Sequence, residues 1–278
     1  MLHLMSIRTI IWPVLLLMVR VLSGQGSAEQ VNVPYPAHAH NDYNHERPLF
    51  DALEHNFRSI EADVYSSGDS LYVGHNRRDI SPGRTLRSLY LDPLKIYLAE
   101  GTGTRYDSAA PLILLIDIKD NGRSTYQLLH RILQDYREML CTATPQGIIP
   151  GRVMAIVSGN RPIEYMEDQD LRFAFVDGRM DDLTMQYPAS LMPLVSDNWT
   201  KHFSWNGEGE VPPEERMKLN DYINQAHENG QLIRFWATPD SPGKERDAVW
   251  KLLLDEGVDL INSDDLEGLR AFIMTHQR

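Results

Sequence analysis

The amino-acid sequence predicts an α/β protein with a (β/α)8, or TIM, barrel, in a regular or an irregular form. Eight short apolar runs of strand length alternate with segments in which apolar residues have helical spacing. This alternation favours parallel strands joined by helices. Polar clusters follow most of the apolar runs, as is typical of barrels whose functional side chains lie at the carboxyl ends of the strands.

The expected strands extend along the chain from residue 33 to residue 262. They are Val33–Ala37, Ser59–Val64, Leu112–Ile116, Val153–Val157, Arg172–Val176, Met192–Val195, Leu232–Trp236 and Leu260–Asn262. The expected helices between them are Pro48–His55, Leu86–Ala99, Tyr126–Met139, Pro162–Glu167, Pro213–Asn229 and Arg246–Glu256. A last helical register continues through Leu266, Leu269, Phe272 and Ile273, and Asp264–Asp265 is expected to cap it.

Glycine and proline positions agree with these helix limits. Gly230 and Gly257 follow two of the helices, where a left-handed terminating residue is expected. Pro212 and Pro213 lie at a helix start, where proline is tolerated. An open doubly wound sheet is the alternative architecture, but no glycine-rich phosphate-binding sequence follows the first expected strand.

Length and composition indicate one globular domain. The chain has 278 residues, of which 42% are hydrophobic, and this is enough to bury a sizeable core. Its formal net charge of −12 argues against nucleic acid or an anionic membrane as a general partner. An anionic substrate therefore needs local help from a metal ion or from a few basic groups.

The first 28 residues are expected to form a signal peptide that precedes a single domain at 29–278. Arg8 is followed by the apolar stretch Thr9–Val19, which is short for a bilayer span, and Gly24–Ala28 supplies small residues for cleavage. We therefore expect an exported protein, periplasmic or secreted, with no transmembrane anchor in the mature chain. Cys141 is the only cysteine, which excludes an intramolecular disulfide. The oligomeric state is left open.

Three acidic residues suggest a metal site. Glu61 and Asp63 lie two positions apart on an expected strand, so their side chains face the same side. Asp117 follows the next expected strand and can join them. Carboxylate oxygens suit Mg²⁺ or Ca²⁺ better than zinc. We expect these three residues to hold one divalent cation.

Histidines near the same strand ends suggest acid–base chemistry. His75 ends the run at residues 71–73, and His38 and His40 lie two positions apart after the first strand. Histidine commonly transfers protons near neutral pH. One of His38 and His40 is expected to work with His75, and the sequence leaves open which one.

Four further residues are candidates for binding an anionic substrate. Lys119 follows Asp117 by two positions and either contacts a phosphoryl oxygen or holds the carboxylates in place. Arg179 and Arg234 are additional cations, although salt bridges that close the barrel are the competing interpretation. Trp236 is expected either to form a pocket wall or to belong to the core.

These segments resemble a known superfamily of barrel phosphodiesterases. It includes glycerophosphodiester phosphodiesterases, phosphatidylinositol-specific phospholipases C and sphingomyelinase D. The segment 38–43 (HAHNDY) is similar to a branch whose fungal member is called altered inheritance of mitochondria protein six. The segments 59–64 (SIEADV), 73–75 (VGH) and 115–119 (LIDIK) resemble the superfamily strands that carry its acidic residues, its second histidine and a lysine.

The resemblance extends over most of the chain, from about His38 to Ile273. It implies that Glu61, Asp63 and Asp117 bind the cation and that a histidine near residue 40 acts with His75. It also adds Asn41 to the candidate substrate-binding residues. Two departures put glycerol-phosphate specificity in doubt: no Arg-Gly pair follows the first histidine, and the third carboxylate is Asp rather than Glu.

The sequence therefore predicts a metal-dependent phosphoric diester hydrolase. Its expected substrate is a small phosphodiester that resembles a glycerophosphodiester or a phospholipid headgroup. A non-catalytic secreted protein that binds a phosphorylated ligand is the first alternative. A glycoside hydrolase is the second, because barrels with paired carboxylates commonly cleave sugars.

Overall fold

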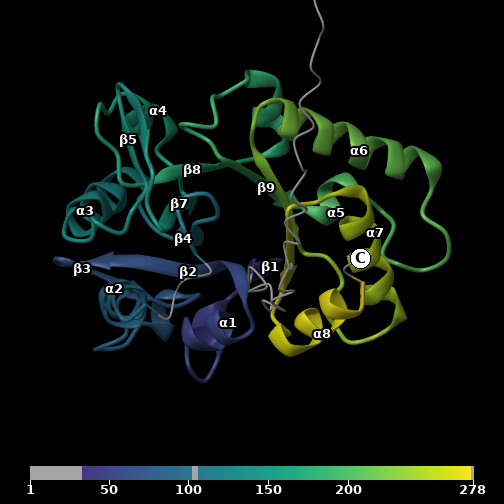
Figure 1. Cartoon of the computed structure of the whole chain (residues 1–278), viewed down its shortest axis with the longest axis horizontal. Helices are drawn as coiled ribbons and strands as arrows, with labels where there is room; N and C mark the ends of the chain where they lie inside the picture. Colours follow the sequence, from purple (N-terminus) through teal and green to yellow (C-terminus); the bar gives the residue numbers. More distant parts are fainter. Residues whose placement is uncertain (1–32, 102–105, 277–278) are drawn as a thin grey trace, which may run out of the picture. The chain divides into compact units, whose positions relative to one another are not determined.

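A computed structural model describes residues 33–101 and 106–276 of the chain. The expected signal peptide, residues 1–28, lies outside these ranges. Eight parallel strands form a closed barrel with helices around it, which confirms the predicted fold class (Figure 1). The barrel strands are β1 (Tyr35–Ala39), β2 (Phe57–Ser67), β4 (Leu112–Ile118), β7 (Val153–Gly159), β8 (Phe175–Gly178), β9 (Leu194–Asn198), β10 (Leu232–Trp236) and β11 (Leu260–Ser263).

Pairing of the first strand with both β2 and the last strand β11 closes the barrel. Each of the remaining barrel strands pairs with the next one along the chain, from β2 to β4 and on to β11. The register between β1 and β2 shifts between Tyr35 and His38. The expectation of a barrel thus holds, and the shift is one of its irregularities.

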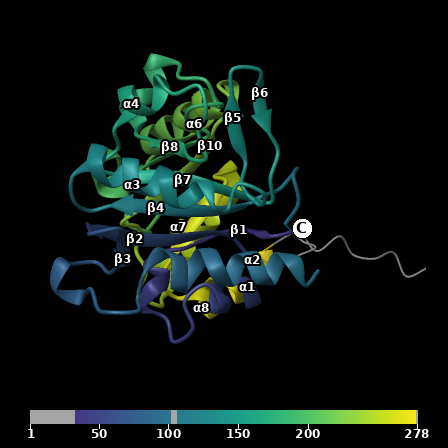
Figure 2. The same ribbon diagram turned by 90° about the vertical axis from the view of Figure 1, so that its left-hand side faces the viewer.

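The helices on the outside of the barrel differ widely in length (Figure 2). They are α1 (Phe50–Glu54), α2 (Asp92–Ala99), α3 (Gly122–Gln134), α4 (Ile163–Glu167), α5 (Trp199–His202), α6 (Pro213–Glu228), α7 (Lys244–Glu256) and α8 (Leu266–His276). A π-helical turn at Arg87–Leu91 leads into α2. Between β8 and β9 a 3-10 helix, Met180–Met185, takes the place of an α-helix. Among the described residues, no helix is both long and apolar enough to cross a membrane.

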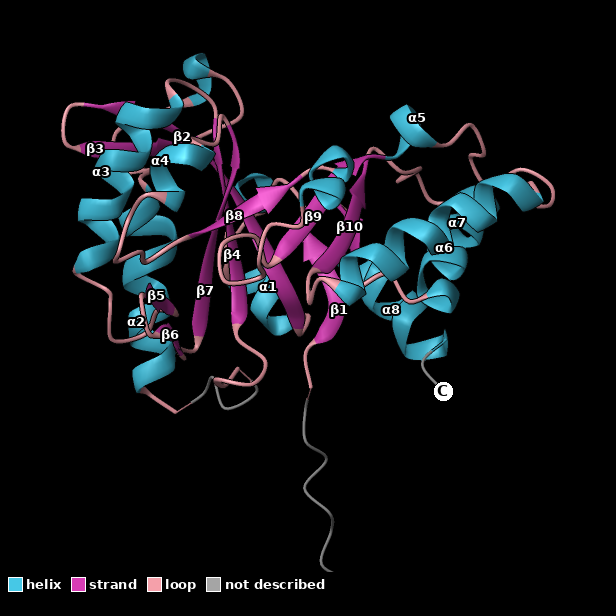
Figure 3. Cartoon of the chain, turned by 90° about the horizontal axis from the view of Figure 1, so that it is seen from above, coloured by secondary structure: helices cyan, strands magenta, loops and turns pink. Residues whose placement is uncertain are grey.

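Two β-hairpins add to the barrel and were not among the expected strands. Strand β3 (Ser70–Val73) runs antiparallel to the end of β2 and leads to His75. Strands β5 (Thr142–Thr144) and β6 (Gly147–Ile149) form a separate hairpin just before β7 (Figure 3). Both hairpins are short, so their apolar patterns extend over too few residues to distinguish them from loops.

Side chains that point into the barrel change character along its axis. Near the amino ends of the strands they are apolar, and Ile113, Leu115, Ile156, Phe175 and Leu194 pack there as a buried cluster. Near the carboxyl ends the inward positions are polar. They include His38, Glu61, Asp63, Ser158, Asp177, Ser196, Arg234 and Asn262, all of them buried.

This change explains why several expected strands ended too early. The apolar pattern of β4 stops at Ile116, but the strand continues to Ile118 and carries Asp117. Likewise β9 extends to Asn198 and β8 to Gly178, beyond the expected ends at residues 195 and 176. Backbone hydrogen bonds to neighbouring strands continue where the interior side chains become polar, so hydrophobicity alone underestimates the strand length.

Candidate active site

Neighbouring strands bring three carboxylates together at the carboxyl end of the barrel. Glu61 and Asp63 lie on β2, and Asp63 pairs in register with Asp117 on β4. Each residue offers a carboxylate oxygen, and these three atoms lie within 4.8 Å of one another. The structure thus brings the three predicted ligands to one place.

The chemistry of these carboxylates fits a hard divalent cation. Asp63 Oδ1 and Asp117 Oδ1 are buried and have no hydrogen-bond partner. Burial raises the pKa of Asp117 to about 6, since desolvation outweighs the attraction of Lys119. Buried carboxylates without partners are costly, and a bound cation would remove that cost. Both oxygens are available as ligands.

Glu61 remains a carboxylate because basic groups surround it. Burial would raise its pKa, but the hydrogen bond from His38 and the charge of Arg234 lower the pKa below its usual value. His38 Nε2 lies 2.9 Å from Glu61 Oε2, and Arg234 Nη1 lies 3.5 Å from the same oxygen. Oε1 of Glu61 has no hydrogen bond from any described residue, and Glu61 lines the pocket.

His38 and His40 have different surroundings although they lie on one side of the chain. His38 is completely buried, and its two nitrogens contact Ser59 Oγ (2.7 Å) and Glu61. Burial, with the charge of Arg234, lowers the pKa of His38 to about 3, so His38 is neutral at physiological pH. His40 lines the pocket instead.

Asp264 holds His40 in place. His40 Nδ1 donates to Asp264 Oδ1 over 2.7 Å, which leaves Nε2 available as a proton acceptor. Burial would lower the pKa of His40, but the hydrogen bond with Asp264 and the nearby charge of Glu61 raise the pKa above its usual value. The pair Asp264–Asp265 was expected to cap α8, and Asp265 does so by accepting from the Gly268 N–H (2.9 Å). Asp264 contacts His40 instead.

His75 contacts the acidic cluster directly. Its Nδ1 is 3.0 Å from Asp63 Oδ2, and about 60% of its side chain is exposed. His40 and His75 both line the same pocket, together with Glu61 and Asp117. The structure thus brings both histidines to the pocket that Glu61 and Asp117 line, while their roles stay a prediction.

The Tyr43 hydroxyl connects the two histidine environments, although no sequence pattern indicated a role for this residue. It lies 2.6 Å from Asn41 Oδ1, 2.8 Å from Asp63 Oδ2 and 3.4 Å from His75 Nδ1. The Asn41 amide nitrogen lies 2.8 Å from His40 Nδ1. Asn41 has a left-handed backbone (φ 49°), a conformation that Asn tolerates better than most residues. Asn41 thus supports the site and also lines the pocket.

Lys119 lies between two of the carboxylates. Its ammonium is 3.0 Å from Asp63 Oδ2 and 3.2 Å from Asp117 Oδ2. Lys119 thus pairs with the Oδ2 atom of each carboxylate, and the Oδ1 atoms remain without a partner. Of the two interpretations left open for Lys119, the structure shows the pairing with carboxylates. Because Lys119 also lines the pocket, it can still reach an anionic ligand.

Two arginines and a tryptophan form the opposite wall of the pocket, which has a volume of about 270 Å³. Arg179 pairs with Asp177 Oδ2 over 2.8 Å. Arg234 donates to Asn262 Oδ1 (3.0 Å), while its buried Nε has no partner. Trp236 is partly exposed and is a wall residue rather than part of the core.

Gly159 at the end of β7 is a further residue that the site requires. It has φ of +66°, and a Cβ atom there would lie 2.1 Å from Asp117 Oδ1. A side chain at this position would displace a predicted metal ligand. The sequence contains Gly159 within the segment that resembles the phosphodiesterases, but its close approach to Asp117 requires the three-dimensional structure.

Asp42 next to the site is a buried acid with a pH-dependent effect on stability. Its Oδ2 accepts from the Leu49 N–H (2.6 Å) and from Tyr90 (2.9 Å), while Oδ1 is buried without a partner. Burial raises the pKa of Asp42 to about 7, so the folded state binds more protons than the unfolded state between pH 4 and 7. Its contribution to stability therefore decreases as the pH rises through this window.

We expect Asp42→Asn to remove this contribution, because Asn keeps an acceptor for Leu49 and Tyr90. Between pH 4 and 7 the free energy of unfolding of the parent protein should fall more steeply than that of the variant. The difference in slope is up to roughly 1.4 kcal/mol per pH unit. Urea unfolding at several pH values measures this. Parallel slopes for the two proteins would show that Asp42 does not titrate in this range.

Comparison with known proteins agrees with this geometry. The family model described as an AIM6-like phosphodiesterase domain matches residues 27–177, which contain the three clustered carboxylates and His38, His40 and His75. The chain belongs to this family. The AIM6 homolog of Arthroderma benhamiae, named altered inheritance of mitochondria protein 6 homolog, is 30% identical over 265 residues. That match covers 86% of this chain and 84% of the relative. Altered inheritance of mitochondria protein 6 of Eremothecium gossypii is 27% identical and covers 84% of this chain and 68% of the relative.

Solved structures show the same fold as this AIM6-like chain at low sequence identity. A Ca²⁺-dependent phosphatidylinositol-specific phospholipase C from Streptomyces antibioticus aligns with a TM-score of 0.56 and 13% identity. It covers 86% of this chain and 97% of its own. A glycerophosphoryl diester phosphodiesterase from Parabacteroides distasonis aligns with a TM-score of 0.52 and 16% identity, and the match covers 87% of each chain.

Proposed function

We propose that this AIM6-like protein hydrolyses a small phosphodiester with the help of one divalent cation and two histidines. The observation that carries the proposal is the convergence of three carboxylates next to a pocket that His40 and His75 line. The phosphodiesterase-like family and fold support it. Substrates that resemble glycerophosphodiesters or phospholipid headgroups fit the small polar pocket.

Glu61, Asp63 and Asp117 would hold the cation, which is Mg²⁺ or Ca²⁺ because all the available ligands are oxygens. When bound, the cation would polarise the phosphoryl group and offset its negative charge. Five carboxylates and three cations form the ion pairs and charged contacts closest to the three clustered acids. The acidic group comprises Glu61, Asp63, Asp117, Asp177 and Asp264, and the basic group comprises Lys119, Arg179 and Arg234. A dication brings these charges into balance.

His40 is the proposed general base. The hydrogen bond from its Nδ1 to Asp264 fixes the tautomer in which Nε2 accepts a proton from the attacking hydroxyl of water or of the substrate. His75 is the proposed general acid, which protonates the leaving alkoxide from the exposed side of the pocket. Lys119, Arg179 and Arg234 orient the phosphoryl oxygens, with Asn41 and Trp236 at the pocket wall.

A panel of phosphodiesters tests the proposal. We expect turnover of bis(p-nitrophenyl) phosphate or of a glycerophosphodiester that stops with EDTA and returns with added Mg²⁺ or Ca²⁺. The variant Asp181→Asn changes an exposed acid on the 3-10 helix after β8, outside the acidic cluster. It should behave as the parent protein does in each of these assays. Ligand binding without turnover across the panel would favour the alternative of a non-catalytic binding protein.

Variants of the two neighbouring histidines distinguish their roles. His38→Gln weakens the support of Glu61, so we expect a loss of about 10–100-fold that excess cation partly restores. His40→Gln removes the proton acceptor, so we expect a loss of roughly 10²–10⁴-fold that excess cation does not restore. Steady-state kinetics at several cation concentrations measures both. If both variants lost the same activity and excess cation restored both to the same extent, His38 and His40 would not have separate roles.

We also propose that residues 1–28 direct export and are then removed. The N-terminal sequence of the protein recovered from the producing cell tests this. A mature chain that begins near residue 25 or 29 is expected, and an intact Met1 in the exported fraction would contradict cleavage.

A further inference from the structure

A second hollow lies at the amino ends of the barrel strands, away from the candidate active site. Its volume is about 300 Å³, within the range of small-molecule pockets. Most of its lining is apolar, and Ile113, Met154 and Leu232 extend into it from the lowest layer of the barrel interior. The buried residues Leu115 and Ile156 lie one layer further into the barrel, toward the active site.

Arg58 at the start of β2 is the one cationic side chain that lines this hollow among the described residues. Its Nε is buried and has no hydrogen-bond partner. In the described part of the chain, no carboxylate lies within 4.0 Å of the Arg58 guanidinium. The negative charge of Asp259 acts on Arg58 from a longer distance. The Asp259 carboxylate already contacts His227 Nε2 (2.9 Å) and accepts from the Ile233 N–H (2.9 Å). Arg58 therefore keeps a charge and several donors without a partner among residues 33–101 and 106–276.

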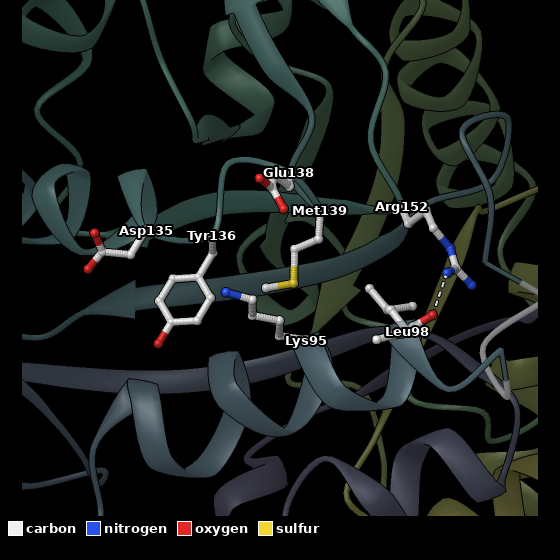
Figure 4. A pocket seen from close by; sticks show the side chains of 8 residues that line it. Lys95, Leu98, Asp135, Tyr136, Glu138, Met139 and Arg152 are labelled. Atoms are coloured by element: carbon white, nitrogen blue, oxygen red, sulfur yellow. Dashed lines mark hydrogen bonds between the residues drawn. The ribbon is translucent and has the colours of Figure 1, made fainter.

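A hollow on the outer wall of the barrel shows the usual situation (Figure 4). There, Arg152 donates to the Leu98 carbonyl over 2.9 Å and to the Tyr106 carbonyl over 2.9 Å. Lys95 lies 5.8 Å from the centre of the Tyr136 ring. Each cation in that hollow has a partner within the protein. Arg58 differs from them in this respect.

A guanidinium whose Nε is buried without an acceptor is costly, and an anion that accepts its hydrogen bonds would remove this cost. A guanidinium binds carboxylate or phosphate oxygens through two parallel hydrogen bonds. An alkyl chain would fill the apolar remainder of the hollow near Ile113, Met154 and Leu232. We propose that this pocket binds a single-chain amphiphile with an anionic head, and that Arg58 pairs with the head.

Calorimetric titration of the full chain with decanoate, below the concentration at which it forms micelles, tests the pocket. We expect one saturable site whose Kd rises at least tenfold in Arg58→Met, while Arg137→Met, which changes an exposed arginine, binds as the parent does. Decanol, which lacks the charge, should bind at least tenfold more weakly. Decyl phosphate in parallel distinguishes a fatty-acid head from a lysophospholipid-like head. Equal affinity of decanoate for the parent protein and Arg58→Met, or no saturable binding to the parent, would overturn the proposal.

Thermal unfolding provides a second readout, because a ligand that binds the folded chain stabilises it. Saturating decanoate should raise the unfolding temperature of the parent protein by several degrees and leave that of Arg58→Met nearly unchanged. Without ligand, Arg58→Met should unfold at the same or a higher temperature, since it replaces a partly buried, unpaired charge with an apolar side chain. Its diesterase turnover should equal that of the parent, so a failure here is separable from a failure of the proposed function. An unfolding temperature of the parent protein that saturating decanoate does not change would contradict the site.

Discussion

Asp63→Asn is expected to lower kcat/KM for bis(p-nitrophenyl) phosphate by roughly 10³-fold or more. Asp63 takes part in three interactions at once. Its Oδ1 is a free candidate ligand, and its Oδ2 contacts Lys119, Tyr43 and His75. Asparagine has nearly the same shape, but it lacks the charge that would bind the cation. Steady-state kinetics with saturating Mg²⁺ or Ca²⁺ measures the loss.

The control for this variant is Asp181→Asn, which makes the same chemical change on an exposed helix at the same end of the barrel. It should keep the parent activity. Circular dichroism and thermal unfolding should show that Asp63→Asn is folded, because removing a buried charge with a raised pKa does not destabilise the cation-free protein. Parent-like turnover in a folded Asp63→Asn protein would rule out the proposed cation site.

Asp264→Asn is expected to shift the acid limb of the kcat/KM profile to lower pH. The negative charge of Asp264 raises the pKa of His40, so its removal lowers that pKa and keeps His40 unprotonated in more acidic solution. The maximal rate should fall about 10–100-fold, because the hydrogen bond that fixes the His40 tautomer loses its charged partner. In a double-mutant cycle, Asp264→Asn should have almost no further effect in His40→Gln.

Asp265→Asn is the matched control, because it changes the neighbouring acid that caps α8 and pairs with Arg246. We expect lower thermal stability with an unchanged pH profile. If Asp264→Asn and Asp265→Asn had the same pH profile of kcat/KM, Asp264 would have no role in positioning His40. Additive effects of Asp264→Asn and His40→Gln would lead to the same conclusion.

The acidic cluster could be predicted from the sequence because it depends on residue spacing within one strand and on the order of neighbouring strands. Two carboxylates at positions i and i+2 on a strand must face one side, and strand order brings Asp117 of β4 next to Asp63 of β2. The barrel itself followed from the alternation of apolar runs and helices. Strand ends were less predictable, since β4 and β9 continue into polar residues that only a polar barrel interior can accommodate.

The same spacing rule could not separate His38 from His40. Both face the interior of the barrel, but His38 lies one layer deeper and is enclosed by Ser59 and Glu61. The two histidines differ in their position along the barrel axis, which residue spacing does not reveal. His38 is buried and His40 lines the pocket, which favours His40 as the histidine that contacts a substrate.

Asp264 and Tyr43 were missed for different physical reasons. Asp264 directly follows the last strand, β11, and lies beside His40 only because β11 pairs with β1 to close the barrel. Because Asp264 lies just before α8, the sequence suggested only a helix-capping role, and Asp265 fills that role. Tyr43 reaches Asp63 through a left-handed turn at Asn41. A tyrosine in such a motif is indistinguishable from a core residue until the turn is known.

The most direct test of the cation site is a crystal structure of the protein soaked in Mn²⁺, with anomalous differences collected at the manganese edge. Manganese prefers the same oxygen ligands as Mg²⁺ and identifies itself by its scattering. We predict one strong peak in the pocket, at about 2.0–2.6 Å from an oxygen of each of Glu61, Asp63 and Asp117. A pocket without a peak, or a peak that contacts none of these three residues, would contradict the account.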